Sequence, residues 1–173
     1  IRLSLVGSEM CIRDSDIAAV IIEPIAGNMG FIEPDISFLK ELRNLCTQNK
    51  TILIFDEVMT GFRVARGGVQ ELLGITPDLT ALGKIVGAGL PVGVYGGKAE
   101  IMNNISPDGP VYQAGTLSGN PIAVSAGTAL LKQLGNKEIY ASMEQNAKSF
   151  LSPIKEYADA LKIPFSFNVR GGM

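Results

Sequence analysis

Four short apolar stretches recur along the chain, and each of them predicts a β-strand. They cover residues 17–22, 51–55, 79–82 and 91–97. The first is continuously apolar, which predicts a strand that is covered on both faces. The last is rich in glycine, so we expect it to lie close to another backbone. A further strand is expected to begin within residues 163–173.

Helical periodicity fills the segments between these strands. After the start signal at Asp35, apolar side chains fall on one helical face at positions 38, 39, 42, 45 and 46. Asn120, followed by proline, marks the start of a second helix. A third is expected over residues 139–161, with Pro153 bending or breaking it. Strands that alternate with helices predict an α/β fold with a mostly parallel sheet.

The composition removes several classes of function. The chain has 173 residues, of which 46% are hydrophobic and 18% charged, so it can bury a sizeable core. It contains no histidine, which excludes the serine–histidine triad and most zinc sites from these residues. The net charge is -2 and the basic residues are not clustered, so we expect neither nucleic acid nor a membrane as a partner.

Residues 1–15 differ from the rest of the chain, because they follow neither a helical nor a strand period. They also lack the long apolar core and the small-residue cleavage site of a secretory leader. We interpret them as a leader that is not native to the protein, and the predicted fold therefore begins at Asp16.

Two carboxylates, Asp56 and Glu57, follow the second apolar stretch, and the residues alone leave three interpretations open. They are the solvated end of a sheet, or they hold magnesium in a nucleotide hydrolase. The hydrolases use a Gly-x-x-x-x-Gly-Lys-Ser/Thr loop, whereas Lys84 is followed here by Ile85. In the third interpretation Asp56 pairs with a protonated pyridine nitrogen, because opposite charges at close range favour both charged forms.

Lys84 follows the third apolar stretch, and a lone lysine of this kind is most often a surface residue. Its neighbours in residues 79–89 are mostly apolar residues and glycines. This setting predicts a desolvated amine, which is available as a neutral nucleophile. An amine that forms a Schiff base with an aldehyde needs this property.

Two loops contain further candidate ligands. Gly115 and Thr116 offer a backbone N–H and a hydroxyl shortly before a helix N-terminus, a combination that suits a phosphate group. Asn28 follows the end of the first strand and could donate a hydrogen bond to a ring oxygen. Without a ligand, the first loop is a polar helix cap and Asn28 is a turn residue.

Five motifs together resemble those of one enzyme family. They are EPIAGN at residues 23–28, LIFDEVMTGFR at 53–63, TPDLTALGK at 76–84, GLPVG at 89–93 and YQAGTLSGNP at 112–121. They resemble the glutamate-1-semialdehyde aminomutases, which are pyridoxal-phosphate enzymes related to the class III aminotransferases. The resemblance is specific, because ordinary class III aminotransferases tend to have Gln at the position of Met59 and another pair at Tyr112 and Gln113.

The resemblance implies a role for each candidate residue. Lys84 corresponds to the lysine that forms a Schiff base with the cofactor and shuttles protons. Asp56 corresponds to the partner of the pyridinium nitrogen. Val58 corresponds to the residue packed on the ring face, and Asn28 to a donor near the ring hydroxyl.

The remaining implications concern the partner subunit and the reaction. Gly115 and Thr116 correspond to phosphate contacts that reach the neighbouring subunit's site, which implies a homodimer. The family moves an amino group between two carbons of glutamate-1-semialdehyde and forms 5-aminolevulinate, a precursor of tetrapyrroles. The cofactor passes through its pyridoxamine form, and no metal is implied.

The resemblance also places the chain within a larger protein. Residues 16–161 correspond to the second half of a fold type I large domain, and residues 162–173 to the start of a C-terminal small domain. The family's chain is more than twice as long, so we expect this piece to be inactive alone. We expect a cytoplasmic protein, or a plastid one in a plant or alga. Three alternatives stay open, namely a class III aminotransferase acting between two substrates, the magnesium-dependent hydrolase, and a structural piece without catalytic activity.

Overall fold

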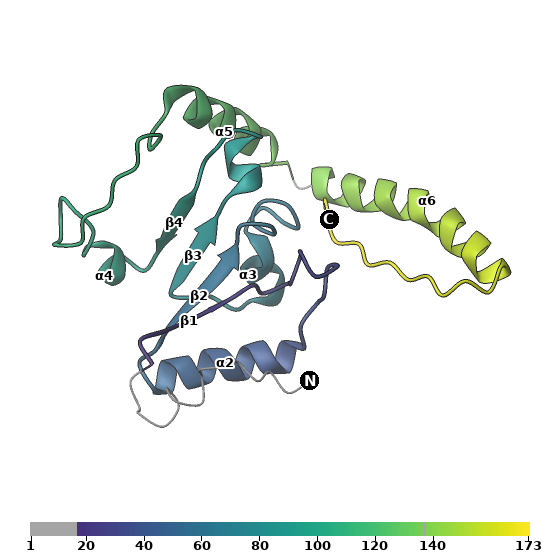
Figure 1. Ribbon diagram of the computed structural model, residues 1–173, viewed down its shortest axis with the longest axis horizontal. Coiled ribbons are helices and arrows are strands. Elements are labelled where there is room, and N and C mark those ends of the chain that lie inside the picture. Colours follow the sequence, from purple (N-terminus) through teal and green to yellow (C-terminus); the bar gives the residue numbers. More distant parts are fainter. Residues whose placement is uncertain (1–16, 137) are drawn as a thin grey trace.

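The computed structural model describes residues 17–136 and 138–173 (Figure 1). In this part of the chain four strands form one sheet in the order β1-β2-β3-β4. The strands are β1 (Ala19–Ile22), β2 (Ile52–Glu57), β3 (Leu79–Leu82) and β4 (Val94–Gly97). β2 pairs in parallel with β1 and β3, whereas β4 pairs antiparallel with β3. The predicted α/β fold with a mostly parallel sheet is therefore confirmed.

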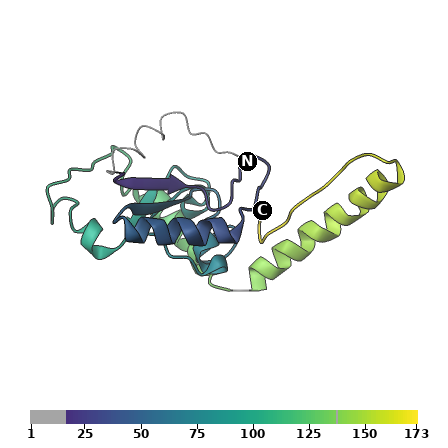
Figure 2. The same ribbon diagram turned by 90° about the horizontal axis from the view of Figure 1, so that it is seen from below.

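Within the described residues, six helical elements connect and extend the strands. They are α2 (Ile36–Gln48), α3 (Gly68–Leu73), the 3-10 helix η1 (Lys84–Gly87), α4 (Ala99–Met102), α5 (Pro121–Gln133) and α6 (Glu138–Ala160). α2 and α5 begin where predicted, because Asp35 and Asn120 accept hydrogen bonds from free backbone N–H groups of the first turn. α6 extends away from the sheet (Figures 1 and 2) and is continuous through Pro153, so this proline does not break it.

The main core lies between α2 and one face of the sheet, an arrangement visible in Figure 2. Leu53 and Phe55 of β2 are fully buried in a cluster with Leu39 and Cys46 of α2. Side chains alternate between the two faces of a strand. Glu57 therefore belongs to the covered face with Leu53 and Phe55, and Asp56 belongs to the opposite face.

The face opposite α2 is exposed at β1 in the described part of the chain. Ile21 of β1 lies on it and is 64% exposed. Exposed and half-buried residues alternate along β1, which is the first strand in the sheet order. The prediction that residues 17–22 are covered on both faces is therefore wrong, because β1 lies at an edge of this sheet and α2 covers only one face.

Asp78 joins three strands at the amino-terminal edge of β3. Its buried carboxylate accepts a hydrogen bond from the Leu53 N–H at 2.7 Å and pairs with both Arg43 Nη1 and Lys98 Nζ at 2.7 Å. Burial raises the pKa of this carboxyl, but the hydrogen bonds from Lys98, Leu53 and Arg43 outweigh it and lower the pKa to about 2. The cluster thus fixes α2, β2, β3 and the end of β4 to one another.

β4 is shorter than the predicted strand over residues 91–97, because it begins at Val94. A Cβ atom added to Gly97 would lie 2.1 Å from the carbonyl oxygen of Asp78. The expectation that this glycine-rich strand approaches another backbone closely is confirmed.

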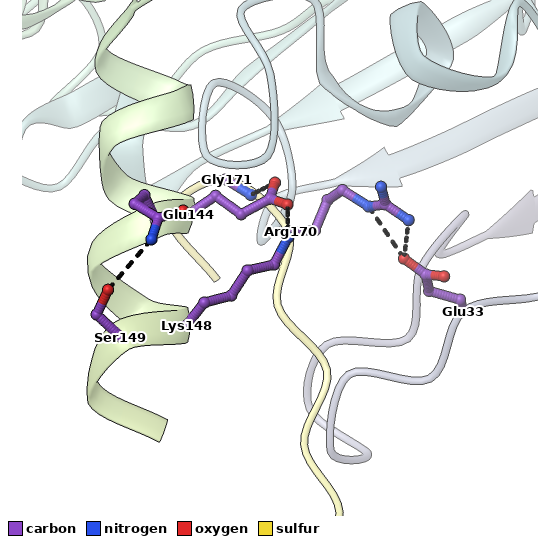
Figure 3. Close-up of polar contacts among 7 residues, drawn as sticks. Glu33, Glu144, Lys148, Ser149, Arg170 and Gly171 are labelled. Carbon is purple, nitrogen blue, oxygen red and sulfur yellow. Dashed lines mark hydrogen bonds and ion pairs between the residues drawn. The ribbon is translucent and has the colours of Figure 1, made fainter. Parts of the chain in front are cut away.

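The C-terminal segment, residues 163–173, forms no strand, so the predicted strand is wrong. The segment instead returns from the end of α6 toward the sheet, and polar contacts hold it (Figure 3). Arg170 pairs with Glu33 at 2.9 Å, and the Gly171 N–H donates to Glu144 of α6 at 3.2 Å. The predicted leader at residues 1–15 lies outside the described residues, and the domain boundaries at 16–161 and 162–173 stay predictions.

Candidate active site

The carboxyl-terminal ends of β2 and β3 bring Asp56 and Lys84 to one edge of the sheet. In the parallel register Asp56 lies opposite Ala81, and Glu57 lies opposite Leu82. Lys84 follows two residues after Leu82, as the first residue of η1. Adjacent strands lie about 4.8 Å apart. The acid at the end of β2 and the amine just after β3 are therefore neighbours at the same edge of the sheet.

Asp56 is half-buried at the end of β2. Its Oδ1 atom accepts a hydrogen bond from the Val58 N–H at 3.0 Å. Among the described residues this is the only hydrogen bond of the carboxylate, and no cation pairs with it. Since a carboxylate accepts several hydrogen bonds, Asp56 retains the capacity to bind a further donor.

Lys84 has a backbone φ of 48°, in the left-handed region that a non-glycine residue seldom adopts. Its side chain is exposed and forms no ion pair within the described ranges. The prediction of a desolvated amine is therefore wrong for this chain, because Lys84 lies exposed beside an open hollow of about 540 Å³. The hollow also contains Arg63, a second positive charge near the amine.

Val58 connects the two strand ends. Its side chain is half-buried, and a Cβ atom added to Gly83 would lie 3.1 Å from Val58 Cγ1. The side chain that follows Asp56 therefore packs against the backbone that precedes Lys84.

Asn28 lies in a tight turn that the structure brings to the same edge. The turn is closed by paired hydrogen bonds of 3.1 Å between the backbones of Ala26 and Ile32. A Cβ atom added to Gly27 would lie 2.8 Å from the sulfur of Met59, so the turn contacts the loop that follows Asp56. The Asn28 side chain is exposed and has no hydrogen-bond partner in the part of the chain that the structure describes.

Gly115 and Thr116 lie apart from this group. Both are exposed in the loop before α5, where the Ser118 N–H donates to the Gly115 carbonyl at 2.9 Å. Gly115 lines a small hollow of about 200 Å³ together with residues 91–93 and the first turn of α5. The described contacts do not bring this loop to Asp56 or Lys84.

Glu57 is a residue whose importance the sequence interpretation missed. It is fully buried and lies on the face of the sheet opposite Asp56, so the two carboxylates do not converge on one ion. Among the described residues no three potential ligands come together around a metal. This arrangement gives no support to the magnesium-dependent hydrolase. The signal was present in the sequence, since Glu57 continues the alternation of buried Leu53 and Phe55.

Comparison with known protein families places these elements in context. Residues 8–173 match the family model described as aminotransferase class-III. The chain is 52% identical over 167 residues to the glutamate-1-semialdehyde 2,1-aminomutase of Desulfotalea psychrophila, and 54% identical over 162 residues to that of Pelotomaculum thermopropionicum. These alignments cover 95% and 94% of this chain but only 39% and 37% of the two relatives. The chain thus spans less than half the length of the curated relatives it matches.

Solved structures share the fold. An omega-transaminase from Sphaerobacter thermophilus superposes with a TM-score of 0.85 at 34% identity, covering 95% of this chain and 38% of that one. A glutamate-1-semialdehyde-aminomutase from Pseudomonas aeruginosa PAO1 in complex with PMP superposes with a TM-score of 0.81 at 26% identity. That match also covers 95% of this chain and 38% of the other. Within the described residues, no helix combines the length and apolar character needed to cross a membrane.

Proposed function

The chain belongs to the class III aminotransferase family, and from this premise we propose that it acts, as part of a longer protein, as a glutamate-1-semialdehyde 2,1-aminomutase. The proposed reaction converts glutamate-1-semialdehyde to 5-aminolevulinate. The observation that carries the proposal is the placement of Asp56 and Lys84 at the same edge of two paired strands. The named relatives at 52% and 54% identity support the aminomutase over other reactions of the family.

The residues at this edge fit pyridoxal phosphate. Asp56 has one hydrogen bond among the described residues, which leaves the carboxylate able to bind a ring N–H. Lys84 is exposed at the end of the neighbouring strand, where its amine can reach an aldehyde. Val58 lies between the two strand ends and offers an apolar surface to a planar ring. When bound, pyridoxal phosphate supplies an aldehyde that binds amines covalently and a ring that withdraws electrons from the attached carbon.

The two charged residues then have distinct tasks. The Asp56 carboxylate keeps a proton on the ring nitrogen, because an opposite charge at close range favours both charged forms. The Lys84 amine would hold the cofactor at its aldehyde and would accept and return protons at Nζ.

The other candidates have supporting roles in this proposal. Asn28 would donate a hydrogen bond near the ring hydroxyl, since its turn contacts the loop after Asp56 and its amide has no partner among the described residues. Gly115 and Thr116 would bind the phosphate in the site of a second subunit, which makes the protein a homodimer. Their exposure and their separation from Lys84 support a role across an interface. We further propose a cytoplasmic location, as expected for an enzyme of small soluble metabolites in bacterial relatives.

Borohydride reduction of the whole protein, followed by peptide mapping, tests the proposal. We expect a pyridoxyl label on Lys84, and no label on this peptide in the Lys84→Ala variant. Lys98→Ala, which removes a lysine at the other end of the same strands, should keep the label on Lys84. A labelled cofactor on another residue, or none with cofactor present, would overturn the assignment.

The choice between the aminomutase and a two-substrate aminotransferase needs a second assay. The whole enzyme, reconstituted with cofactor, is given glutamate-1-semialdehyde as its only substrate. Formation of 5-aminolevulinate supports the aminomutase. A labelled Lys84 without this product, together with turnover when a separate amino donor and acceptor are added, would identify the aminotransferase instead.

A further inference from the structure

Glu57 is a carboxylate buried without a cation. Its side chain is 0% exposed, and none of the lysines and arginines in the described residues pairs with it. A buried charge of this kind is stable only when hydrogen bonds replace its hydration. Glu57 must therefore draw its stabilisation from neutral donors.

Four donors surround the carboxylate of Glu57. Oε2 accepts from the Thr60 hydroxyl at 3.0 Å and from the Val69 N–H at 2.7 Å. Oε1 accepts from the Gln70 N–H at 3.2 Å and from the Gln70 side-chain amide at 3.1 Å. Two of these donors are backbone N–H groups in the first turn of α3, so the carboxylate ties the end of β2 to the start of this helix.

The backbone at the start of α3 lies close to the carboxylate of Glu57, and a glycine makes this approach possible. Gly68 has a φ of +68°, and a Cβ atom added there would lie 2.1 Å from Glu57 Oε2. Only glycine combines that left-handed backbone with such a close approach. The glycine at position 68 thus makes room for a side chain of β2.

Gln70 extends the connection from β2 to β3. Its amide donates to Glu57 and also to the Thr80 hydroxyl, at 3.2 Å. Thr80 lies in β3, four residues before Lys84, and Glu57 directly follows Asp56. One side-chain amide therefore links the strand that carries the acid to the strand that carries the amine.

From these contacts we infer that Glu57 is a positioning residue, which acts through the backbone to aim the Asp56 carboxylate at the cofactor. The inference rests on the proposed function for the role of Asp56. Adjacent residues of a strand point to opposite faces, so anchoring Glu57 beneath the sheet fixes the direction of Asp56 above it. Asp56 needs this support because a single hydrogen bond, to Val58, orients its carboxylate among the described residues.

The test compares variants of the whole holoenzyme. In Glu57→Gln an amide N–H₂ replaces a carboxylate oxygen that accepts from two donors, so donors face donors. In Gln70→Glu the new carboxylate faces the carboxylate of Glu57, so the two repel each other. The double variant pairs an amide at 57 with a carboxylate at 70. We expect each single change to raise the cofactor Kd by about ten-fold, the equivalent of one lost hydrogen bond, and to shift the absorption band of the bound cofactor. The double variant should recover part of the lost affinity and part of the spectral shift, because the two side chains pair again while the backbone N–H of residue 70 still faces the new amide.

Asp78→Asn serves as the matched control, because Asp78 is also a buried carboxylate but lies at the opposite edge of the sheet. It should lower the melting temperature and leave the cofactor Kd and spectrum unchanged. If Glu57→Gln behaves in the same way, with a lower melting temperature but the wild-type Kd and spectrum, Glu57 is only a structural residue and the inference fails.

A milder variant keeps the test decisive if Glu57→Gln does not fold. Gln70→Ala removes the amide that joins Glu57 to Thr80 but keeps every backbone donor to Glu57. We expect a smaller spectral shift in the same direction, whereas Gln133→Ala at the end of α5 should give none. Identical spectra for the two alanine variants would overturn the inference. The labelling of Lys84 in the wild-type protein is independent of these results, so failure of the inference and failure of the proposed function are distinguishable.

Discussion

Charged side chains are paired at one end of the parallel strands and unpaired at the other, among the described residues. At the amino-terminal edge the Asp78 carboxylate is buried between two cations and a backbone N–H. At the carboxyl-terminal edge Asp56 lies near the end of β2 and Lys84 follows the end of β3, and in the described part of the chain neither has an ionic partner. Charges that satisfy one another hold a fold together, whereas charges left without partners are available to a ligand. This difference locates the candidate site.

The two buried carboxylates, Asp78 and Glu57, also differ in their partners. Asp78 is neutralised by Arg43 and Lys98, and its low pKa follows from these partners. Glu57 has no cation among the described residues and depends on four neutral donors, two of them from the start of α3. The first arrangement joins elements at an edge remote from the site. The second lies directly behind Asp56, which is why a role in positioning is inferred for Glu57 and not for Asp78.

The largest effect is expected from removing the amine at the carboxyl-terminal edge. Lys84→Ala in the whole enzyme should lower turnover at least about a thousand-fold, because proton transfer and cofactor attachment are lost together. Lys98→Ala, at the other edge, should leave turnover per folded enzyme within about two-fold, as a partly exposed ion pair contributes little. Steady-state formation of 5-aminolevulinate measures both. Equal losses in the two variants would remove the distinction between the edges.

The next largest effects are expected from replacing the aspartate at each edge, Asp56 and Asp78. Asp56→Asn should reduce turnover by about a hundred-fold to a thousand-fold, because an opposite charge about 4 Å away contributes at most on the order of 4 kcal/mol at an effective dielectric constant of 20, and each 1.36 kcal/mol is ten-fold in rate. Asp78→Asn should instead reduce the free energy of unfolding by about 3 kcal/mol, since it breaks a buried charge cluster. Turnover per folded enzyme and urea unfolding separate the outcomes. A stability loss without a rate loss in Asp56→Asn would contradict its assignment.

A smaller effect appears in acid. The folded pKa of Asp78 is about 2 and its ordinary value is 3.8, so the folded state binds this proton less readily than the unfolded state. The resulting stability, about 2 kcal/mol, is present above pH 4 and is lost as the pH falls from about 4 to 2. Unfolding curves of the wild type should weaken over this range, and those of Asp78→Asn should weaken less. Parallel curves would show that Asp78 does not carry this pH dependence.

The smallest effect is expected from an ion pair that lies in neither cluster. Glu33 and Arg170 are more than 40% exposed and join the C-terminal segment to the chain after the Asn28 turn (Figure 3). Arg170→Ala should cost less than about 1 kcal/mol of unfolding free energy, because solvent screens exposed pairs. Thermal unfolding at low and high salt measures this. A loss as large as that of Asp78→Asn would mean that exposure does not separate strong pairs from weak ones here.

Local signals in the sequence predicted the elements that local physics determines. Asp35 and Asn120 cap α2 and α5 as expected, and the apolar stretches at residues 51–55 and 79–82 became β2 and β3. The α/β pattern predicted a mostly parallel sheet, and β2 and β3 do pair in parallel. Strand type and helix caps are set within a few residues, so a single sequence is enough to predict them.

The features that the sequence did not predict depend on distant partners. The start of α3 is one such feature. The N–H groups of its first turn donate to the carboxylate of Glu57, which lies more than ten positions earlier in the sequence. Residues 163–173 pair with no strand in the described part of the chain. Side-chain contacts of Arg170 with Glu33 and of the Gly171 N–H with Glu144 hold this segment instead. The exposure of Lys84 depends on what covers the hollow beside it, which its flanking apolar residues do not determine.

A crystal structure of the whole enzyme with its cofactor tests the central claim most directly. We predict that an Asp56 carboxylate oxygen lies within about 3 Å of the ring nitrogen and that electron density joins the cofactor to Lys84 Nζ. A ring nitrogen that faces another residue, or an acid and an amine too far apart to contact the same ring, would contradict the claim.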